Sequence, residues 1–363
     1  MAIDSMRVSR RQFLMKISAS ALCMAVPLAA RSSVNTRTAR LLAAWQLPGG
    51  TYQVGVLNTR YSQPGSLHLA DYSIELAIDL PTRPHGLMHM QGDEYLVIAR
   101  RPGDWFMRLN IRNGDTERIW QDEDRHLNGH GVQHGEFLFT TETDVLDSTG
   151  ALAVRNRHTL ALLDVWPTHG RDPHEMLVLP KGGLGIDEPF LLVANGGIPT
   201  HADMGRTQLN HLPMDSSVVA MHPITGKVLK KWTLSDSRLS LRHMAVHASG
   251  IVGIAMQAHH STEALNNAAP VLALLDQHGL RTAAESAGVN GYAGDIVATP
   301  EGFVVSCTKH DSALKFNTQG NQTAVLKAKA ACALASQGEQ VWLGHQASGH
   351  AHSLQLDNHW LLV

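Results

Sequence analysis

The sequence predicts an all-β fold, and specifically a seven-bladed β-propeller, with six or eight blades as the alternatives. Short apolar stretches of strand length alternate with turns rich in Gly, Pro, Asp and Asn over most of the chain, and few segments have helical periodicity. Strand starts with a common format recur at intervals of roughly 35 to 50 residues, which is the repeat length of a four-stranded blade. The seven starts lie near Gln53, Leu87, Val132, Met176, Ala245, Ile296 and Ala333.

The common format is a histidine or small polar residue, a few apolar residues, a glycine turn and a second apolar strand. One interval, between Met176 and Ala245, is longer and holds an insertion that we expect to lie over one face of the propeller. Because a closed β architecture can hold a chain of this length in one domain, we predict a single propeller over residues 41–363. We also expect a strand over residues 40–47 to complete the blade formed by the C-terminal strands.

The N-terminal segment has the pattern of a twin-arginine export signal. Residues 9–14 read SRRQFL, and an apolar run follows that ends in Ala29 and Ala30. That run is too short to predict a membrane span. We predict a signal peptide over residues 1–30, a polar linker over 31–40, and a protein in the periplasm with no stable membrane span after cleavage.

The composition and net charge of the chain do not favour nucleic acid as a partner. The formal net charge is −2 and charged residues make up 17% of the chain, so no basic surface favours nucleic acid. Two cysteines, Cys307 and Cys332, follow the predicted signal. In an oxidising periplasm they could form a disulfide, and two buried thiols are the alternative.

Histidine is the abundant side chain with coordination chemistry, at 22 residues. In a propeller the innermost strands line the central channel, and residues at the start of these strands converge. His85, His130, His174 and His243 occupy this position in four predicted blades. Four imidazoles can complete a coordination shell for a transition metal, with iron or copper as the leading candidates. The alternative, a histidine that only holds a turn of its own blade, has the same pattern in the sequence.

Polar residues near these histidines are predicted to orient them or to bind an anion. These residues are Arg125, His126, Glu175, Arg242 and Asp295. In the long interval, a lid over the channel mouth is predicted from His201, Arg206 and Asn210, with an ordinary surface loop as the alternative. We expect the remaining C-terminal histidines to be surface residues, with weak metal binding as the alternative. They are His345, His350, His352 and His359.

Several motifs occur together in a recognisable order. They are RRPG at 100–103, RHLNGHG at 125–131, PHE at 173–175, VANGGI at 193–198, LSLRH at 239–243 and GYAG at 291–294. With them the chain resembles the bacterial domain of unknown function 1513 family, apart from departures at Leu127-Asn128, Arg171-Asp172, Asp295 and residues 307–310. The resemblance implies a twin-arginine-exported, propeller-like protein. It also implies a role in iron or metal acquisition beside imelysin-type iron-regulated proteins or di-haem peroxidase-like proteins.

Three functions are compatible with the sequence. The leading hypothesis is a periplasmic propeller that binds a transition-metal ion or metal complex at its central face. A metal-dependent hydrolase or lactonase, with Glu142, Glu175 or Asp295 as base, is the second, and a protein-interaction scaffold without a metal site is the third. We assign no catalytic residue and favour a binding protein over an enzyme. The fold alone does not decide among them, whereas the distances between the four histidines do.

Overall fold

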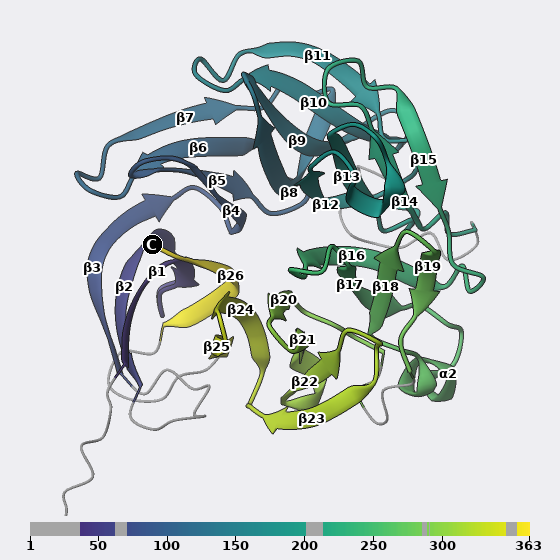
Figure 1. Cartoon of the computed structure of the whole chain (residues 1–363). Coiled ribbons are helices and arrows are strands. Elements are labelled where there is room, and N and C mark those ends of the chain that lie inside the picture. The colour runs from purple at the N-terminus through teal and green to yellow at the C-terminus, as the bar shows by residue number, and fades with distance from the viewer. Residues whose placement is uncertain (1–36, 62–70, 201–212, 285–288, 290, 346–353) are drawn as a thin grey trace, which may run out of the picture.

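The chain forms a β-propeller, with sheets arranged around a central axis (Figure 1). The computed structural model describes residues 37–61, 71–200, 213–284, 289, 291–345 and 354–363. Six sheets have four strands, and one further sheet, β24–β25, has two strands among these residues. The prediction of an all-β propeller is confirmed. The count of seven is wrong, because the structure has six four-stranded blades.

Four of the blades follow one another in the chain. In each of them the four strands pair in chain order, and the first strand is innermost (Figure 1). The first two are β4 (Pro84–Gln91), β5 (Glu94–Ala99), β6 (Trp105–Asn110) and β7 (Thr116–Trp120), then β8 (Arg125–His134), β9 (Phe137–Asp144), β10 (Gly150–Asn156) and β11 (Leu162–Pro167). The next two are β12 (Pro173–Leu179), β13 (Phe190–Asn195), β14 (Ser217–Met221) and β15 (Val228–Trp232), then β16 (Leu239–Val246), β17 (Val252–Ala258), β18 (Leu272–Asp276) and β19 (Gly279–Thr282).

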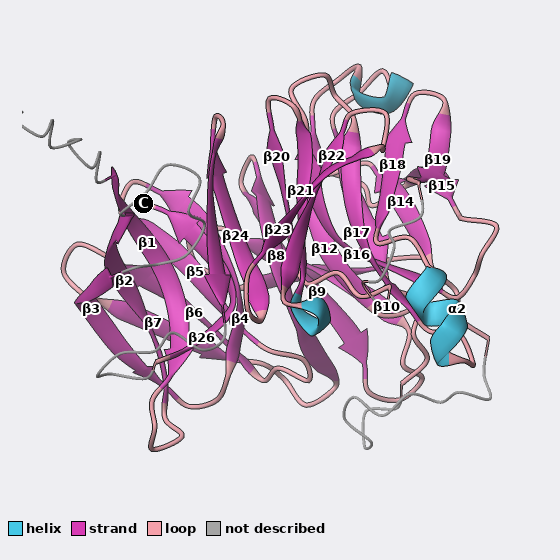
Figure 2. Cartoon of the chain, turned by 90° about the horizontal axis from the view of Figure 1, so that it is seen from below, coloured by secondary structure: helices cyan, strands magenta, loops and turns pink. Residues whose placement is uncertain are grey.

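The remaining strands complete the circle. They are β20 (Ile296–Thr299), β21 (Gly302–Cys307), β22 (Ser312–Asn317) and β23 (Gln322–Lys327), the pair β24 (Ala331–Gln337) and β25 (Gln340–His345), and the blade of β26 (Gln355–Leu362), β1 (Arg37–Gln46), β2 (Tyr52–Tyr61) and β3 (Asp71–Leu80). The helical segments η1 (Gly183–Gly185), α2 (Glu263–Ala268) and η3 (Thr308–His310) are short and lie between strands (Figure 2). No helix of the described residues is long and apolar enough to cross a membrane.

The first and last described strands of the chain lie side by side in one blade. Strand β1 pairs antiparallel with β26, and Leu41 lies opposite Leu362. This pairing confirms the predicted strand that completes the C-terminal blade. The strand begins at Arg37, inside the segment predicted as a linker. Hydrogen bonds between the two chain ends therefore close the ring.

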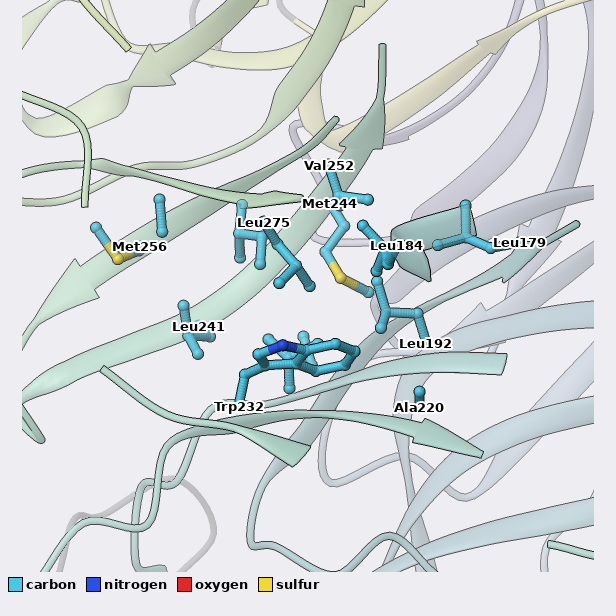
Figure 3. Close-up of a cluster of buried hydrophobic side chains, with 14 of the residues drawn as sticks. Leu179, Leu184, Leu192, Ala220, Trp232, Leu241, Met244, Val252, Met256 and Leu275 are labelled. Carbon is cyan, nitrogen blue, oxygen red and sulfur yellow. The ribbon is translucent and has the colours of Figure 1, made fainter. Parts of the chain in front are cut away.

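Adjacent blades pack face to face through apolar side chains. Between the blades of β12–β15 and β16–β19, Leu192 and Trp232 lie with Leu241, Met244 and Met256 in one buried cluster (Figure 3). Strands β13 and β14 are buried at every position, because neighbouring blades cover both of their faces. The outer strands β7 and β11 are exposed at most positions. The core therefore lies between the blades, and the axis is left to the side chains of the inner strands.

The closing blade provides a test of this packing. Trp360 of β26 is 3% exposed and packs with apolar residues of β1, β2, β24 and β25. We expect Trp360→Ala to lower the free energy of unfolding by about 3–5 kcal/mol, because it leaves a cavity in the blade that closes the ring. Trp120→Ala is the control, since Trp120 is 57% exposed on β7 and its loss is expected to cost about 0.5 kcal/mol or less. Equal urea midpoints for the two variants would contradict this account.

Candidate metal centre

Five histidines from five inner strands meet on the axis. They are His85 of β4, His130 of β8, His174 of β12, His243 of β16 and His359 of β26. Ring centroids of neighbouring members lie 4.4–6.0 Å apart. We call these five residues the histidine cluster. The structure thus brings together all four histidines that the sequence singled out and adds a fifth.

The fifth member corrects one expectation. His359 was expected at the surface, but its side chain is only 12% exposed and its ring lies 4.5 Å from that of His243. It reaches the axis because β26 is the inner strand of the closing blade. The order of strands could have indicated this position. If the N-terminal strand is the second strand of the closing blade, the last strand of the chain is its innermost strand.

The inner strands are irregular where the histidines lie. Register shifts fall between Pro84 and Gly86 in β4, Leu127 and Gly131 in β8, Pro173 and Met176 in β12, and Leu241 and Met244 in β16. A β-bulge changes the direction of the side chains that it carries, and bulges are common next to functional sites. In β24 the corresponding shift holds Cys332. The repeated bulge explains why side chains in this one position of each strand turn toward the same point.

Glycine allows two of these strands to approach closely. Gly129 has φ +98°, and a Cβ on it would lie 2.6 Å from Cδ2 of His85. A Cβ on Gly86 would collide with the carbonyl oxygen of Gly129. The Gly-His-Gly motif of β8 therefore lets the rings of His85 and His130 meet edge to face, with centroids 4.7 Å apart.

Four members of the cluster form a set with the geometry to hold a metal ion. One nitrogen from each of His85, His130, His243 and His359 lies within 4.8 Å of the other three. We call these residues the tetrad. Bonds of ~2.0–2.1 Å to a tetrahedral ion place ligand nitrogens roughly 3.4 Å apart, so the widest pairs have to close up slightly around an ion. The described residues of the cluster can therefore supply four nitrogen ligands from four different strands.

His174 lies beside the tetrad, with both of its nitrogens in contact with neighbours. Its Nε2 is 3.0 Å from Nε2 of His243, and its Nδ1 is 3.2 Å from a guanidinium nitrogen of Arg242. Arg242 in turn binds Asp172 at 2.9 Å. Burial lowers the pKa of Arg242 to about 10. His174 is thus positioned to orient His243 rather than to offer a free nitrogen.

The tetrad has buried nitrogens without hydrogen-bond partners. They are both ring nitrogens of His85, Nε2 of His130, Nδ1 of His243 and Nε2 of His359. A buried polar atom with no partner costs free energy, which a coordinated ion would offset. Burial first, and neighbouring positive groups second, hold the pKa of His85, His130 and His243 well below 6.5. These imidazoles are therefore neutral, which is the form that coordinates metals.

Two carboxylates lie behind the tetrad. Oδ2 of Asp295 is 3.4 Å from Nδ1 of His359 and accepts a hydrogen bond from the amide of Leu334. Burial opposes the protonation of His359, but the nearby carboxylates, Asp295 first, raise its pKa above the ordinary value. Oε2 of Glu175 is 3.6 Å from Nδ1 of His243, and burial raises the pKa of Glu175 to about 7. A carboxylate in the position of Asp295 orients a metal-binding imidazole in known metal sites, whereas Nδ1 of His243 has no hydrogen-bond partner among the described residues and Glu175 accepts from the amide of Met244.

Other residues singled out in the sequence lie elsewhere. Arg125 donates to Glu142 at 2.9 Å, and Arg155 donates to the same carboxylate at 2.9 Å. No contact described for Arg125 reaches the histidine cluster. His126 lines a separate cavity with Arg100 and Arg101. The predicted lid residues His201, Arg206 and Asn210 fall outside the described residues. Cys307 and Cys332 are buried and do not form a disulfide, which agrees with the alternative of two buried thiols.

The histidine cluster separates two cavities. One, of 250 Å³, is lined by His85, His174 and His243 together with cationic and amide side chains. The other, of 270 Å³, is lined by His130, Glu175 and apolar residues of β4 and β26. An ion held by the tetrad would therefore lie between a strongly cationic cavity and a more apolar one.

The buried carboxylate of Glu142 offers a test that is independent of the metal. Glu142→Ala leaves the guanidinium groups of Arg125 and Arg155 without their shared buried partner. We expect the free energy of unfolding to fall by about 3–5 kcal/mol. Glu136→Ala is the matched control: its side chain is 67% exposed, and the loss of its pairs with Arg157 and His158 should cost less than about 1 kcal/mol. Urea unfolding of both variants measures the difference, and a Glu142→Ala protein as stable as the control would refute it.

Comparison with known proteins gives a family and a fold. A family model described as Protein of unknown function (DUF1513) matches residues 78–363. A structure of hydrazine synthase from Kuenenia stuttgartiensis is similar with a TM-score of 0.52, at 12% identity over 78% of this chain and 85% of that chain. The Dos1 propeller is similar with a TM-score of 0.51, at 9% identity over 84% of this chain and 78% of that chain. These identities support the propeller fold alone, and no curated protein matches the chain.

Proposed function

This chain belongs to the DUF1513 family of proteins of unknown function, and we propose that its histidine cluster binds one transition-metal ion. The observation that carries the proposal is the tetrad, whose four nitrogens lie within 4.8 Å of one another. Imidazole suits iron, copper and zinc, and we favour iron or copper. The tetrad would hold the ion, His174 would orient His243 through its Nε2, and Asp295 would orient His359 through its Nδ1.

The setting of this function is also part of the proposal. The twin-arginine pattern of residues 9–14 supports action in the periplasm. The family resemblance supports a role accessory to iron or metal acquisition, with imelysin-type or di-haem peroxidase-like proteins as partners. Twin-arginine export carries folded proteins, so a protein of this kind could receive its metal before export.

Binding is favoured over the two alternatives on specific contacts. A hydrolase needs a carboxylate free to act as base, but Glu142 is held by Arg125 and Arg155. Asp295 accepts hydrogen bonds from the amides of Ile296 and Leu334, and Glu175 accepts one from the amide of Met244. A scaffold without a site predicts histidines that stay apart, whereas the rings in the cluster lie 4.4–6.0 Å from their neighbours.

Metal titration tests the proposal directly. Purified protein stripped with a chelator should bind about one equivalent of copper(II), or of iron(II) without oxygen. His130→Ala should lower the affinity by at least about 100-fold, because it removes one of four ligands. His134→Ala is the control, since His134 lies at the far end of the same strand and outside the tetrad. Absence of tight binding in the unchanged protein, or an unaltered affinity in His130→Ala, would refute the proposal.

A second pair of variants identifies the ligand set. We expect His359→Ala to lose metal affinity as severely as His130→Ala, because His359 belongs to the tetrad. His174→Ala should weaken binding by only about tenfold, since it removes a partner of His243 and not a ligand. X-ray absorption spectroscopy of the loaded protein should count four imidazole nitrogens in both the unchanged protein and His174→Ala. A severe loss in His174→Ala with full binding in His359→Ala would instead favour the four histidines predicted from sequence.

A further inference from the structure

The 250 Å³ cavity next to the histidine cluster has a one-sided charge. Five cationic side chains line it: Arg83, Arg100, Arg101, Arg242 and Lys309. Among the described residues that line the cavity, none is Asp or Glu. The other polar lining comes from amide and hydroxyl groups, including Asn128, Gln257 and Asn358. We call this space the arginine cavity.

Carboxylates behind the lining neutralise only part of this charge. Asp357 forms a two-pronged pair with Arg83 at 2.7 Å. Asp172 is shared between Arg101 and Arg242. Among the described residues, these three lining arginines therefore share two carboxylates. Lys309 adds a further cation, with its ammonium 4.0 Å from the centre of the Tyr292 ring.

Arg242 connects this charge to the candidate metal centre. The residue is 4% exposed, and its Nε is buried with no hydrogen-bond partner. One of its other guanidinium nitrogens lies 3.2 Å from His174. A buried guanidinium with a free donor is costly unless an acceptor reaches it, and oxyanions with two adjacent oxygens match its geometry. The rings of His85 and His243 line the same cavity, so an acceptor bound there also lies beside the tetrad.

Charge balance points in the same direction. An imidazole that coordinates a metal is a neutral ligand, so an ion held by the tetrad would add its full positive charge next to the lining arginines. At such short range like charges repel, and a negatively charged ligand in the cavity removes that repulsion. The volume limits the ligand to a small one, since typical small-molecule pockets hold ~300–1,000 Å³.

We propose that the arginine cavity binds a small, multiply charged oxyanion, of the polycarboxylate or phosphate kind, which shares the metal ion with the tetrad. This inference rests on the proposed metal function only for the sharing of the ion. The binding of the anion itself is a property of the cavity and is expected in metal-free protein too. By linkage, an anion that neutralises the ion must bind more tightly when the ion is present, and the ion more tightly when the anion is present.

Calorimetry on the full metal-free protein tests the anion site. The probes are citrate and inorganic phosphate, with acetate as the singly charged comparison. We expect citrate or phosphate to bind and acetate to bind at least tenfold more weakly. The tighter of the two identifies the class as polycarboxylate or phosphate. No binding of either, or acetate binding equally well, overturns the proposal.

Variants of the cavity lining make the test specific. Lys309→Ala and Arg100→Ala should each weaken binding of the tighter anion about tenfold, because each removes one charged donor. Lys327→Ala is the control, since Lys327 is an exposed lysine of β23 outside the cavity lining. Circular dichroism confirms the fold of each variant. Equal affinities in all three variants would place the anion elsewhere and refute the assignment.

Repeating the titration on copper-loaded protein separates this inference from the metal proposal. Tighter anion binding, with a shift of the copper electron paramagnetic resonance spectrum and no copper lost on gel filtration, supports a shared ion. An unchanged affinity refutes the sharing. If the protein binds no metal but Lys309→Ala still weakens anion binding, the metal proposal fails and the anion site stands. If metal binds and neither anion does, the anion site fails alone.

Discussion

The pairing of β1 with β26 is the interaction on which the rest of this structure depends. It joins the two chain ends by main-chain hydrogen bonds, so the circle of blades closes without any covalent link. It also determines which strand of the closing blade is innermost. Because β26 takes that place, His359 reaches the axis and completes the tetrad. Closure of the fold and completion of the tetrad therefore depend on the same blade, because His359 lies on its innermost strand.

Within the closed ring, apolar side chains form the core between the blades, and the histidines of the inner strands lie at the axis. Apolar contacts between blades, such as those around Trp232, stabilise the fold, and on the inner strand β16 they involve Leu241 and Met244 on either side of the bulge. The inner strands can then carry bulges, close glycine contacts and buried polar groups at little cost to the core. The bulge recurs from blade to blade, and so the side chains that it redirects converge. A metal centre on the axis is in this sense a consequence of repetition: each strand supplies one ligand, and no local motif is needed.

The sequence was sufficient for the fold class and for four members of the histidine cluster, because both follow from the repeat. It was insufficient where the repeat ends. The start assigned near Ala333 lies in β24, which forms a two-stranded sheet with β25 among the described residues, and this accounts for the wrong blade count. The last inner strand, β26, lacks the common format, and this accounts for the misplacement of His359. The roles within the cluster could not be read from spacing either. That His174 contacts Arg242 and His243 depends on side chains about 70 positions away in the chain, which come together only after the blades have packed.

The electrostatics of the axis follow from these placements. The proposed tetrad would hold an ion through the lone pairs of its imidazoles and not through charge. The carboxylates Asp295 and Glu175 lie beside His359 and His243, and Asp295 would orient His359 without entering the coordination shell. The arginines that line the arginine cavity place positive charge on the other side of the tetrad. An ion between them would be attracted from one side and repelled from the other, and an anion in the cavity would balance its environment. This asymmetry distinguishes the centre from a closed structural metal site, in which the protein alone satisfies the ion.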